Sequence, residues 1–234
     1  MSALISVMIP CYNAAHSLPM ALASLLAQTH TNWECIVVDD GSVDDCGAIV
    51  QAIGDPRIRL HRFEQNRGRA AARQQALDMA QGKYVCMIDA DDWIYPHKLE
   101  RQLAYMEANP EVALLSTGMA LVDEADQLVA QRGVSSEVAP DLICYPPLDA
   151  PRRPPLAHAP SIIRQSVAER YRYDMTFPRA EDVDFMLKII LHHAYAVWPV
   201  ATYAYNEVGS ASFAKIRGDL YNSRRMFWRY RRQY

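Results

Sequence analysis

Short apolar segments alternate with amphipathic segments through the first half of the chain. The apolar segments are rich in β-branched residues and predict strands at residues 4–10, 33–40, 57–63, 83–89 and 112–118. Helical periodicity predicts helices between them at residues 16–28, 44–53, 69–81 and 96–110. Because strands and helices take turns, the chain is expected to form βαβ units. We therefore predict an α/β fold with a mostly parallel sheet flanked by helices.

The second half is less regular. Residues 119–130 predict a hairpin, and the long loop expected over 131–160 contains proline clusters that exclude long helices. A loop of this length within a compact domain is usually functional or mobile. Helical patterns return at 161–170 and 180–193, and a strand is expected at 197–205.

Composition narrows the class of protein. The chain has 234 residues, of which 50% are hydrophobic and 22% charged, which indicates a globular domain. A net charge of -3 argues against a protein whose main partner is nucleic acid. The five cysteines form no C-x-x-C pair, so we expect reduced thiols and no zinc site. Neither a signal peptide nor an apolar segment of about 20 residues is present, so we expect a cytoplasmic protein.

Three polar clusters each follow a predicted strand directly. They are PCYN at 10–13, DDGS at 39–42 and DADD at 89–92. Ligands of parallel sheets bind at the carboxyl ends of the strands, where loops meet helix N-termini. The three clusters are therefore expected to open on the same edge of the sheet.

The DADD cluster carries the most chemistry. Asp89, Asp91 and Asp92 lie within four residues, and carboxylates held together repel each other. A divalent cation such as Mg²⁺ or Mn²⁺ removes this conflict, because it takes carboxylate and phosphate oxygens as ligands. The alternative is a solvated acidic turn after a strand.

The DDGS cluster allows two interpretations. Asp39 or Asp40 could accept a hydrogen bond from the N–H of a base such as uracil. Alternatively, Asp-Gly marks a turn, and Ser42 or Asp44 caps the next helix.

Charged side chains also begin two later predicted helices. Arg69 and Arg73 are four residues apart, so they share a helix face that suits a diphosphate or simply faces solvent. Glu181 and Asp182 lie in a first turn, where the helix dipole favours acids. The same dipole would keep an aspartate ionised, as a general base must be.

Motifs of several other enzyme classes are missing. The chain has no G-x-x-x-x-G-K-S/T loop and no G-x-G-x-x-G after its first strand, which argues against P-loop NTPases and dinucleotide dehydrogenases. It also lacks G-x-S-x-G and H-E-x-x-H.

Taken in order, these segments resemble the family 2 glycosyltransferases of the GT-A fold. The similar segments are residues 10–13, 37–44, 66–73, 89–96 and the Glu181-Asp182 pair, and the resemblance covers residues 3–212. It implies that a nucleotide-sugar lies against Pro10, Tyr12, Asn13, Asp39, Asp40, Arg69, Arg73, Asp89 and Asp91.

The resemblance also implies roles for single residues. Tyr12 stacks near the base, and Asp40 accepts from it. Asp91, with Asp92 beside it, contacts a Mn²⁺ or Mg²⁺ ion. Asp182 is the catalytic base, and Glu181 supports it or touches the acceptor.

The implied activity is inverting transfer of a sugar from a nucleotide-diphospho-sugar, expected to be UDP-linked, to a hydroxyl of a saccharide or lipid-linked acceptor. Residues 1–118 would form the nucleotide-sugar-binding half, 119–214 the acceptor-binding and catalytic half of the same domain, and 215–234 a basic, aromatic C-terminal helix. The segment at 205–212 lacks the Tyr-Arg-x-His stretch of many relatives, and the Q-x-x-R-W motif of processive synthases is absent.

Several alternatives stay open at this point. The C-terminal helix either packs with a solvated basic face or lies on an anionic membrane. A sugar-nucleotide nucleotidyltransferase would show glycines after the first strand, whereas residues 11–17 have none. A receiver-type module would be about half as long and would carry its acid pair after the first strand. A catalytically silent nucleotide-sugar binder differs from the enzyme only in activity.

Overall fold

The computed structural model describes residues 2–123, 125–137, 141–151, 154, 156–206 and 213–230. Within these ranges ten strands form one sheet. The strands are β1 Ile5–Cys11, β2 Trp33–Asp39, β3 Ile58–Arg62, β4 Tyr84–Met87, β5 Trp93–Ile94, β6 Val112–Val122, β7 Leu128–Arg132, β8 Ile143–Tyr145, β9 Ile162–Arg164 and β10 Ala194–Asn206. The helices are α1 Leu18–Leu26, α2 Cys46–Ile53, α3 Arg69–Met79, α4 Lys98–Ala108, α5 Gln165–Ala168, α6 Glu181–Ile190 and α7 Phe213–Tyr230.

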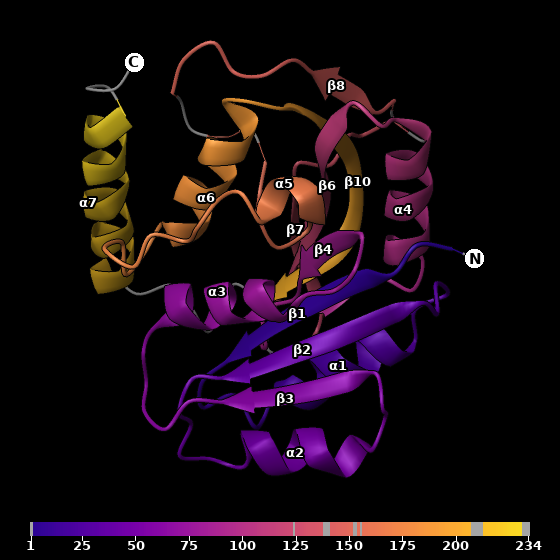
Figure 1. Ribbon diagram of the computed structural model, residues 1–234, viewed down its shortest axis with the longest axis vertical. Coiled ribbons are helices and arrows are strands. Elements are labelled where there is room, and N and C mark those ends of the chain that lie inside the picture. The colour runs from indigo at the N-terminus through magenta and orange to yellow at the C-terminus, as the bar shows by residue number, and fades with distance from the viewer. Residues whose placement is uncertain are drawn as a thin grey trace.

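The sheet has the order β3-β2-β1-β4-β9-β6-β10-β5 (Figure 1). Strands β3, β2, β1 and β4 are parallel neighbours, and β6 is parallel to β10. Strand β9 lies between β4 and β6 and is antiparallel to both. The two parallel groups therefore run in the same direction, and their carboxyl ends meet at one edge of the sheet.

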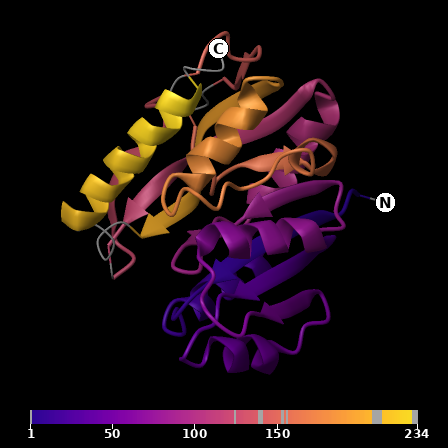
Figure 2. The same cartoon turned by 60° about the vertical axis from the view of Figure 1, so that its left-hand side comes forward.

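Helices cover both faces of the sheet, because side chains alternate along each strand. Val7 and Ile9 of β1 pack on one side in a core with α1, α2 and α4. Met8, between them, faces the opposite core, which α3, α5 and α6 cover. Helix α7 stands beside α6 in both views (Figures 1 and 2), and its Met226 and Tyr230 belong to the second core.

The predicted α/β fold with its mostly parallel sheet is confirmed, but the second half differs from expectation. Residues 161–170 were expected to be helical, whereas they begin with strand β9 and only then form the single turn of α5. A short apolar run such as Ile162-Ile163 cannot be assigned to a strand or a helix from periodicity alone. The expected loop over 131–160 contains the short strand β8, and the predicted hairpin is formed by β6 and β7.

Strand β6 is longer than the sequence predicted. It continues through residue 118 to Val122, so the proposed division after 118 falls within a strand. Helix α7 lies in the stretch where a C-terminal helix was predicted. Among the helices that the structure describes, none is both long and apolar enough to cross a membrane.

Candidate functional site

The loops that follow β1 and β2 are tied together at the carboxyl edge of the sheet. The Asn13 side-chain oxygen accepts from the Val43 N–H at 2.9 Å, and the Asn13 N–H donates to the Ser42 hydroxyl at 3.0 Å. One carboxylate oxygen of Asp44 accepts from the Ala15 N–H at 2.9 Å. The first two polar clusters therefore lie side by side, as their positions after parallel strands predict.

The DDGS turn also packs against the loop before α3, and this contact depends on Gly41. Its φ is +74°, and a Cβ there would lie 2.5 Å from the carbonyl carbon of Gln65. Only glycine therefore lets the DDGS turn close against the loop before α3. Next to it, the two oxygens of Asp40 accept from the N–H groups of Arg67 and Gly68 at 2.7 and 2.9 Å.

The acids of DDGS thus hold the loops together. Asp39 is fully buried, and its Oδ1 accepts from the Ser42 N–H at 2.8 Å. Its Oδ2 lies 3.4 Å from Arg62 Nε. A contact of Asp39 or Asp40 with a base stays a prediction, and it would add to bonds that these carboxylates already make.

The aromatic and proline residues of the first cluster differ in exposure. Tyr12 is 49% exposed, so its ring is accessible for stacking on a base. Pro10 is buried within β1, next to the carboxyl end of the strand. Asn13, which follows Tyr12, has φ +50°, a conformation that asparagine tolerates better than most residues.

The three acids of DADD point to different surroundings. Asp89 follows β4 with 27% of its side chain exposed, and Asp91 is exposed. Asp92 is buried, and its carboxylate accepts from the Tyr203 hydroxyl at 2.7 Å and the Asn206 N–H at 2.9 Å, both on β10. Burial, followed by repulsion from Asp89 and Asp91, raises the pKa of Asp92 well above its usual range.

These contacts bear on the expected metal. Each oxygen of Asp92 already accepts one hydrogen bond from β10, whereas Asp91 is exposed and Asp89 half-buried. The contact of Asp91 and Asp92 with a metal stays a prediction. Throughout the described part of the chain, no group of three or more His, Cys, Asp or Glu side chains is placed to hold a metal ion. One or two carboxylates completed by substrate phosphates is the usual way in which Mg²⁺ is bound. The residues present therefore fit an ion that arrives with a diphosphate.

Arg73 lies at the centre of the candidate site. It is 2% exposed, and its guanidinium donates to Glu181 Oε1 at 2.7 Å and to Asp89 Oδ1 at 3.1 Å. Arg69, one turn earlier on α3, is 53% exposed, with its Nε 3.7 Å from the same Glu181 oxygen. The two arginines share a helix face, as predicted, but only Arg69 reaches solvent.

Asp182 is the second residue of α6, directly after Glu181. It is half-buried and accepts from the Val183 N–H at 2.8 Å. Burial on its own would raise the pKa of Asp182, but the positive Arg73 and the hydrogen bond from the Val183 N–H outweigh burial and hold that pKa below its usual value. Asp182 is therefore ionised at neutral pH, as a general base must be. For Glu181 the balance is the other way: burial outweighs the attraction of Arg73, and the pKa of Glu181 is raised.

Two residues of this cluster were missed by the sequence analysis. The hydroxyl of Tyr173 lies 2.8 Å from His158 Nε2, and the Tyr173 ring stacks on Phe185 of α6 with centroids 4.1 Å apart. Burial, assisted by Arg73, lowers the pKa of His158 to about 4, so the imidazole is neutral at neutral pH while it shares a hydrogen bond with the Tyr173 hydroxyl. Neither residue belongs to a motif in the sequence, so only the fold shows that they adjoin α6.

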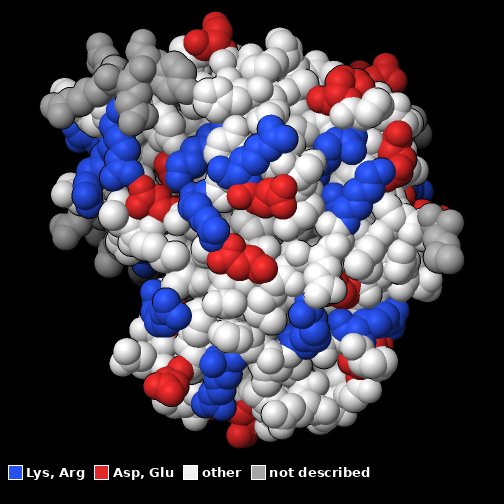
Figure 3. All heavy atoms as spheres, viewed as in Figure 1, with Lys and Arg blue, Asp and Glu red and all other residues white. Residues whose placement is uncertain are grey.

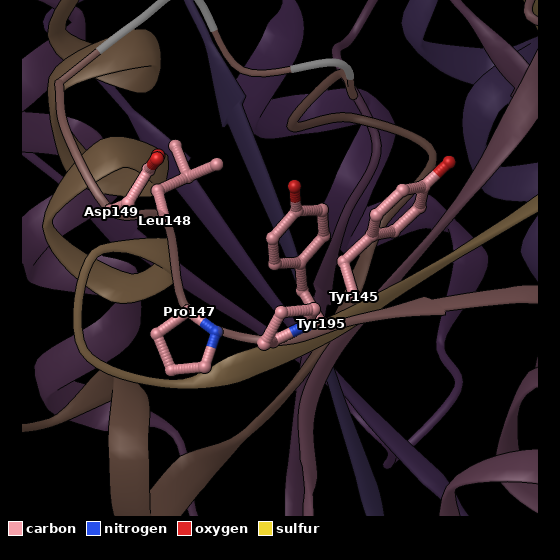
Figure 4. Close-up of a pocket in the computed structure, with 6 residues that line it drawn as sticks. Tyr145, Pro147, Leu148, Asp149 and Tyr195 are labelled. Atoms are coloured by element: carbon pink, nitrogen blue, oxygen red, sulfur yellow. The ribbon is translucent and has the colours of Figure 1, made fainter.

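A small pocket lies away from this cluster (Figure 4). It has a volume of about 250 Å³ and is lined by Tyr145, Pro146, Pro147, Leu148, Asp149 and Tyr195. Tyr195 is near the start of β10, whereas Asn206 at the other end of this strand contacts Asp92. Since a strand rises about 3.3 Å per residue, the stretch of β10 between the pocket and the acids is roughly 35 Å long. It contains none of the predicted site residues.

Charged residues on the face of α3, α5 and α6 are mixed in sign (Figure 3). Arg172 pairs with Asp78 at 2.5 Å, and Arg229 of α7 pairs with Asp174. The Tyr230 hydroxyl also donates to Asp184 of α6 at 2.9 Å. The last two bonds fasten the end of α7 beside the start of α6.

Comparisons of the sequence with known proteins agree with this geometry. The chain is 40% identical over 106 residues to the UDP-Glc:alpha-D-GlcNAc-diphosphoundecaprenol beta-1,3-glucosyltransferase WfgD of Escherichia coli, covering 45% of this chain and 42% of that protein. It is 44% identical over 105 residues to the putative teichuronic acid biosynthesis glycosyltransferase TuaG of Bacillus subtilis, covering 44% of this chain and 42% of that protein. The chain thus spans less than half the length of these relatives.

Solved structures share the fold. The complex of S. aureus TarS 1-349 with UDP has a TM-score of 0.74 at 24% identity, covering 95% of this chain and 65% of that one. The mannosyltransferase PcManGT of Pyrobaculum calidifontis, in complex with GDP-Man and Mn²⁺, has a TM-score of 0.75 at 17% identity, covering 99% of this chain and 65% of that one. The model of the family described as Glycosyl transferase family 2 matches residues 6–139, more than half of the sequence. This chain, with its acids gathered on one edge of a GT-A sheet, therefore belongs to glycosyltransferase family 2.

Proposed function

We propose that this protein is a metal-dependent, inverting glycosyltransferase that moves a sugar from a UDP-linked donor to a hydroxyl acceptor. The observation that carries the proposal is that Asp182 directly follows Glu181, which Arg73 joins to Asp89 at the carboxyl end of β4. The relative named for UDP-Glc and the structural neighbour crystallised with UDP support the choice of donor.

The donor would lie across the carboxyl edge of the sheet. Tyr12 would stack near the base, and Asp39 and Asp40 would stand beneath it. Arg69, the exposed arginine of α3, would face the diphosphate. Asp89 and Asp91 would hold a Mn²⁺ or Mg²⁺ ion together with the phosphates. When bound, this ion neutralises charge on the departing nucleoside diphosphate.

Asp182 would act on the acceptor. Its carboxylate takes the proton of the acceptor hydroxyl as the acceptor oxygen forms a bond to the anomeric carbon. The bond from that carbon to the diphosphate oxygen breaks on the opposite face, and the nucleoside diphosphate leaves with the bonding electrons. Attack and departure on opposite faces invert the configuration of the sugar.

The acceptor is proposed to be a saccharide, carried on a lipid or free. WfgD is named for a substrate linked to diphosphoundecaprenol, which is a membrane lipid. Helix α7 exposes Tyr221, Arg224, Arg225 and Trp228. Aromatic and basic side chains on one helix suit the interface of an anionic membrane. We therefore include a peripheral membrane contact through α7 in the proposal.

The test is transfer by the Asp182→Asn variant. Asparagine keeps the shape of the side chain but cannot take a proton, so kcat should fall by a factor of about 100 or more. Binding of UDP with Mn²⁺, measured by calorimetry, should change by less than about threefold, because Asp182 does not serve the donor. Asp91→Asn should instead weaken the binding of UDP, and added Mn²⁺ should no longer strengthen that binding. Near-normal transfer by Asp182→Asn would refute the assignment of the base, and a wild-type protein that transfers no sugar from any nucleotide donor would refute the function.

A further inference from the structure

The two acid motifs of the site are far apart in the sequence and are joined by one buried side chain. Asp89 follows β4, and Glu181 begins α6, 92 positions later. Arg73 donates from one terminal nitrogen to Glu181 at 2.7 Å and from the other to Asp89 at 3.1 Å. Its exposure of 2% leaves no surface for a diphosphate.

Glu181 is likewise an interior residue. It is 1% exposed, so an acceptor could not reach it without displacing its neighbours. Its second oxygen and the Arg73 Nε are buried without a hydrogen-bond partner among the described residues. Arg73 at 2.7 Å and the more distant Arg69 at 3.7 Å both approach Glu181 Oε1, so the Arg73 bond is the shorter of these two links to α3.

The backbone before Glu181 shows why such a link matters. Ala180 has φ +70°, in the left-handed region that a residue with a Cβ enters at a cost of about 1–2 kcal/mol. Strained backbone of this kind persists only where surrounding contacts fix it. The Arg73–Glu181 bond holds the first residue of α6 in place, and Asp182 is the next residue along the chain.

We propose that Arg73 is a positioning residue that sets the distance between the nucleotide-sugar and the base, by holding Glu181 of α6 against Asp89 at the end of β4. Arg73 then touches neither the diphosphate nor the acceptor, and it holds α6 in place through its hydrogen bond to Glu181. The inference rests on the proposed function, since it assigns a role in the same transfer reaction.

The first experiment compares Arg73→Lys with Arg164→Lys. Lysine keeps the charge, but its ammonium lacks the planar fork that reaches two carboxylates at once. Arg164 is the matched control, because it is also an inward-facing arginine that joins distant elements, through Tyr84 and the carbonyls of Met106 and Val112, none of which is in the site. Both variants should unfold at a lower temperature than the wild type. Only Arg73→Lys should lose kcat, by about 10- to 100-fold, with the dissociation constant of UDP and Mn²⁺ within about threefold of wild type.

A double-variant cycle with Glu181→Gln separates a bridge from two independent contacts. If Arg73 acts through Glu181, the kcat of Arg73→Lys/Glu181→Gln should be close to that of the worse single variant. Independent roles, such as Glu181 touching the acceptor, would multiply the two losses and overturn the inference. A weakening of UDP binding that matches the loss of kcat in Arg73→Lys would also overturn it, because it would place Arg73 at the diphosphate. If wild type transfers sugar while Arg73→Lys keeps kcat within twofold, the inference alone fails; if wild type transfers none, the proposed function fails with it.

Discussion

Buried charge is concentrated where α3, β4 and α6 meet. Arg73 is the central cation, and Asp89, Glu181 and Asp182 are the carboxylates that raise its pKa against the effect of burial. Taking such groups out of water costs several kcal/mol each, and hydrophobic residues of similar volume are often as stable. The arrangement is therefore better explained by the chemistry of the site than by stability. Three acids around Arg73 and the nearby Arg69 leave a net negative charge, which the proposed divalent cation would balance.

The neutral His158 beside this cluster predicts a pH dependence of stability. Its pKa is about 4 in the folded protein, whereas an unfolded histidine titrates near 6.5. Between these values the unfolded chain binds more protons than the native one, so the free energy of unfolding falls as the pH drops from about 6.5 to 4. The full effect would be up to about 3 kcal/mol at 1.36 kcal/mol per pKa unit.

Urea denaturation at several pH values from 4.5 to 7.5 measures this effect against His158→Gln. Glutamine can still hydrogen-bond to Tyr173 as donor or acceptor but does not titrate. The free energy of unfolding of the variant should therefore fall less steeply than that of wild type as the pH is lowered. Identical slopes for the two proteins would show that His158 is not held neutral.

At the scale of elements, the beginnings of α3 and α6 are specified by backbone geometry. Gly68, with φ +89°, precedes α3, and Asp40 accepts from its N–H. The corresponding position before α6 is Ala180, with φ +70° and no side-chain cap. The residue before α3 is thus a glycine, which suits a positive φ, whereas the residue before α6 is an alanine, which does not.

This difference predicts opposite effects on stability and activity. Ala180→Gly should raise the free energy of unfolding by about 0.5–1 kcal/mol, because relief of strain exceeds the added entropy of an unfolded glycine. The same variant should lower kcat, since the first turn of α6 becomes less sharply oriented around Asp182. Chemical denaturation and initial transfer rates measure the two effects. Ala180→Val should be less stable than wild type, and a more stable valine variant would contradict the strain argument.

For the whole molecule, one edge of the sheet gathers all the candidate residues, while α7 lies outside the layers. Its buried Met226 and Tyr230 hold it to the domain, and its exposed side chains include Tyr221 at 63% and Trp228 at 59%. A helix docked through one face presents a fixed opposite face, so the exposed aromatic and basic residues can meet a flat surface together.

Membrane binding is therefore predicted to depend on α7 and on salt. The exposed arginines are changed in Arg224→Glu/Arg225→Glu, and the control Arg101→Glu/Arg170→Glu makes the same change in net charge elsewhere on the surface. At about 1 kcal/mol for each basic residue, the α7 variant should bind anionic vesicles at least roughly thirtyfold more weakly in a sedimentation assay. The control should bind like wild type, and binding of wild type should weaken as salt rises. Equal binding by all three proteins would exclude α7 as the membrane contact.

The sequence by itself determined the repeating strands and helices and the placement of acids after β2 and β4. These features are local, because β-branched runs and helical periodicity act over a few residues, and parallel connections bring strand ends to one edge. The resemblance to glycosyltransferase family 2 rested on the same residues, since these loops carry the motifs.

Only the tertiary structure decided which of several similar residues faces the site. Asp91 is exposed whereas its neighbour Asp92 is bound to β10, and Arg73 is buried whereas Arg69, one turn away, is not. The insertion of β9 between β4 and β6 was equally hidden in the sequence. Each outcome depends on packing between segments that are distant along the chain, and no local pattern encodes the direction from which a distant segment arrives.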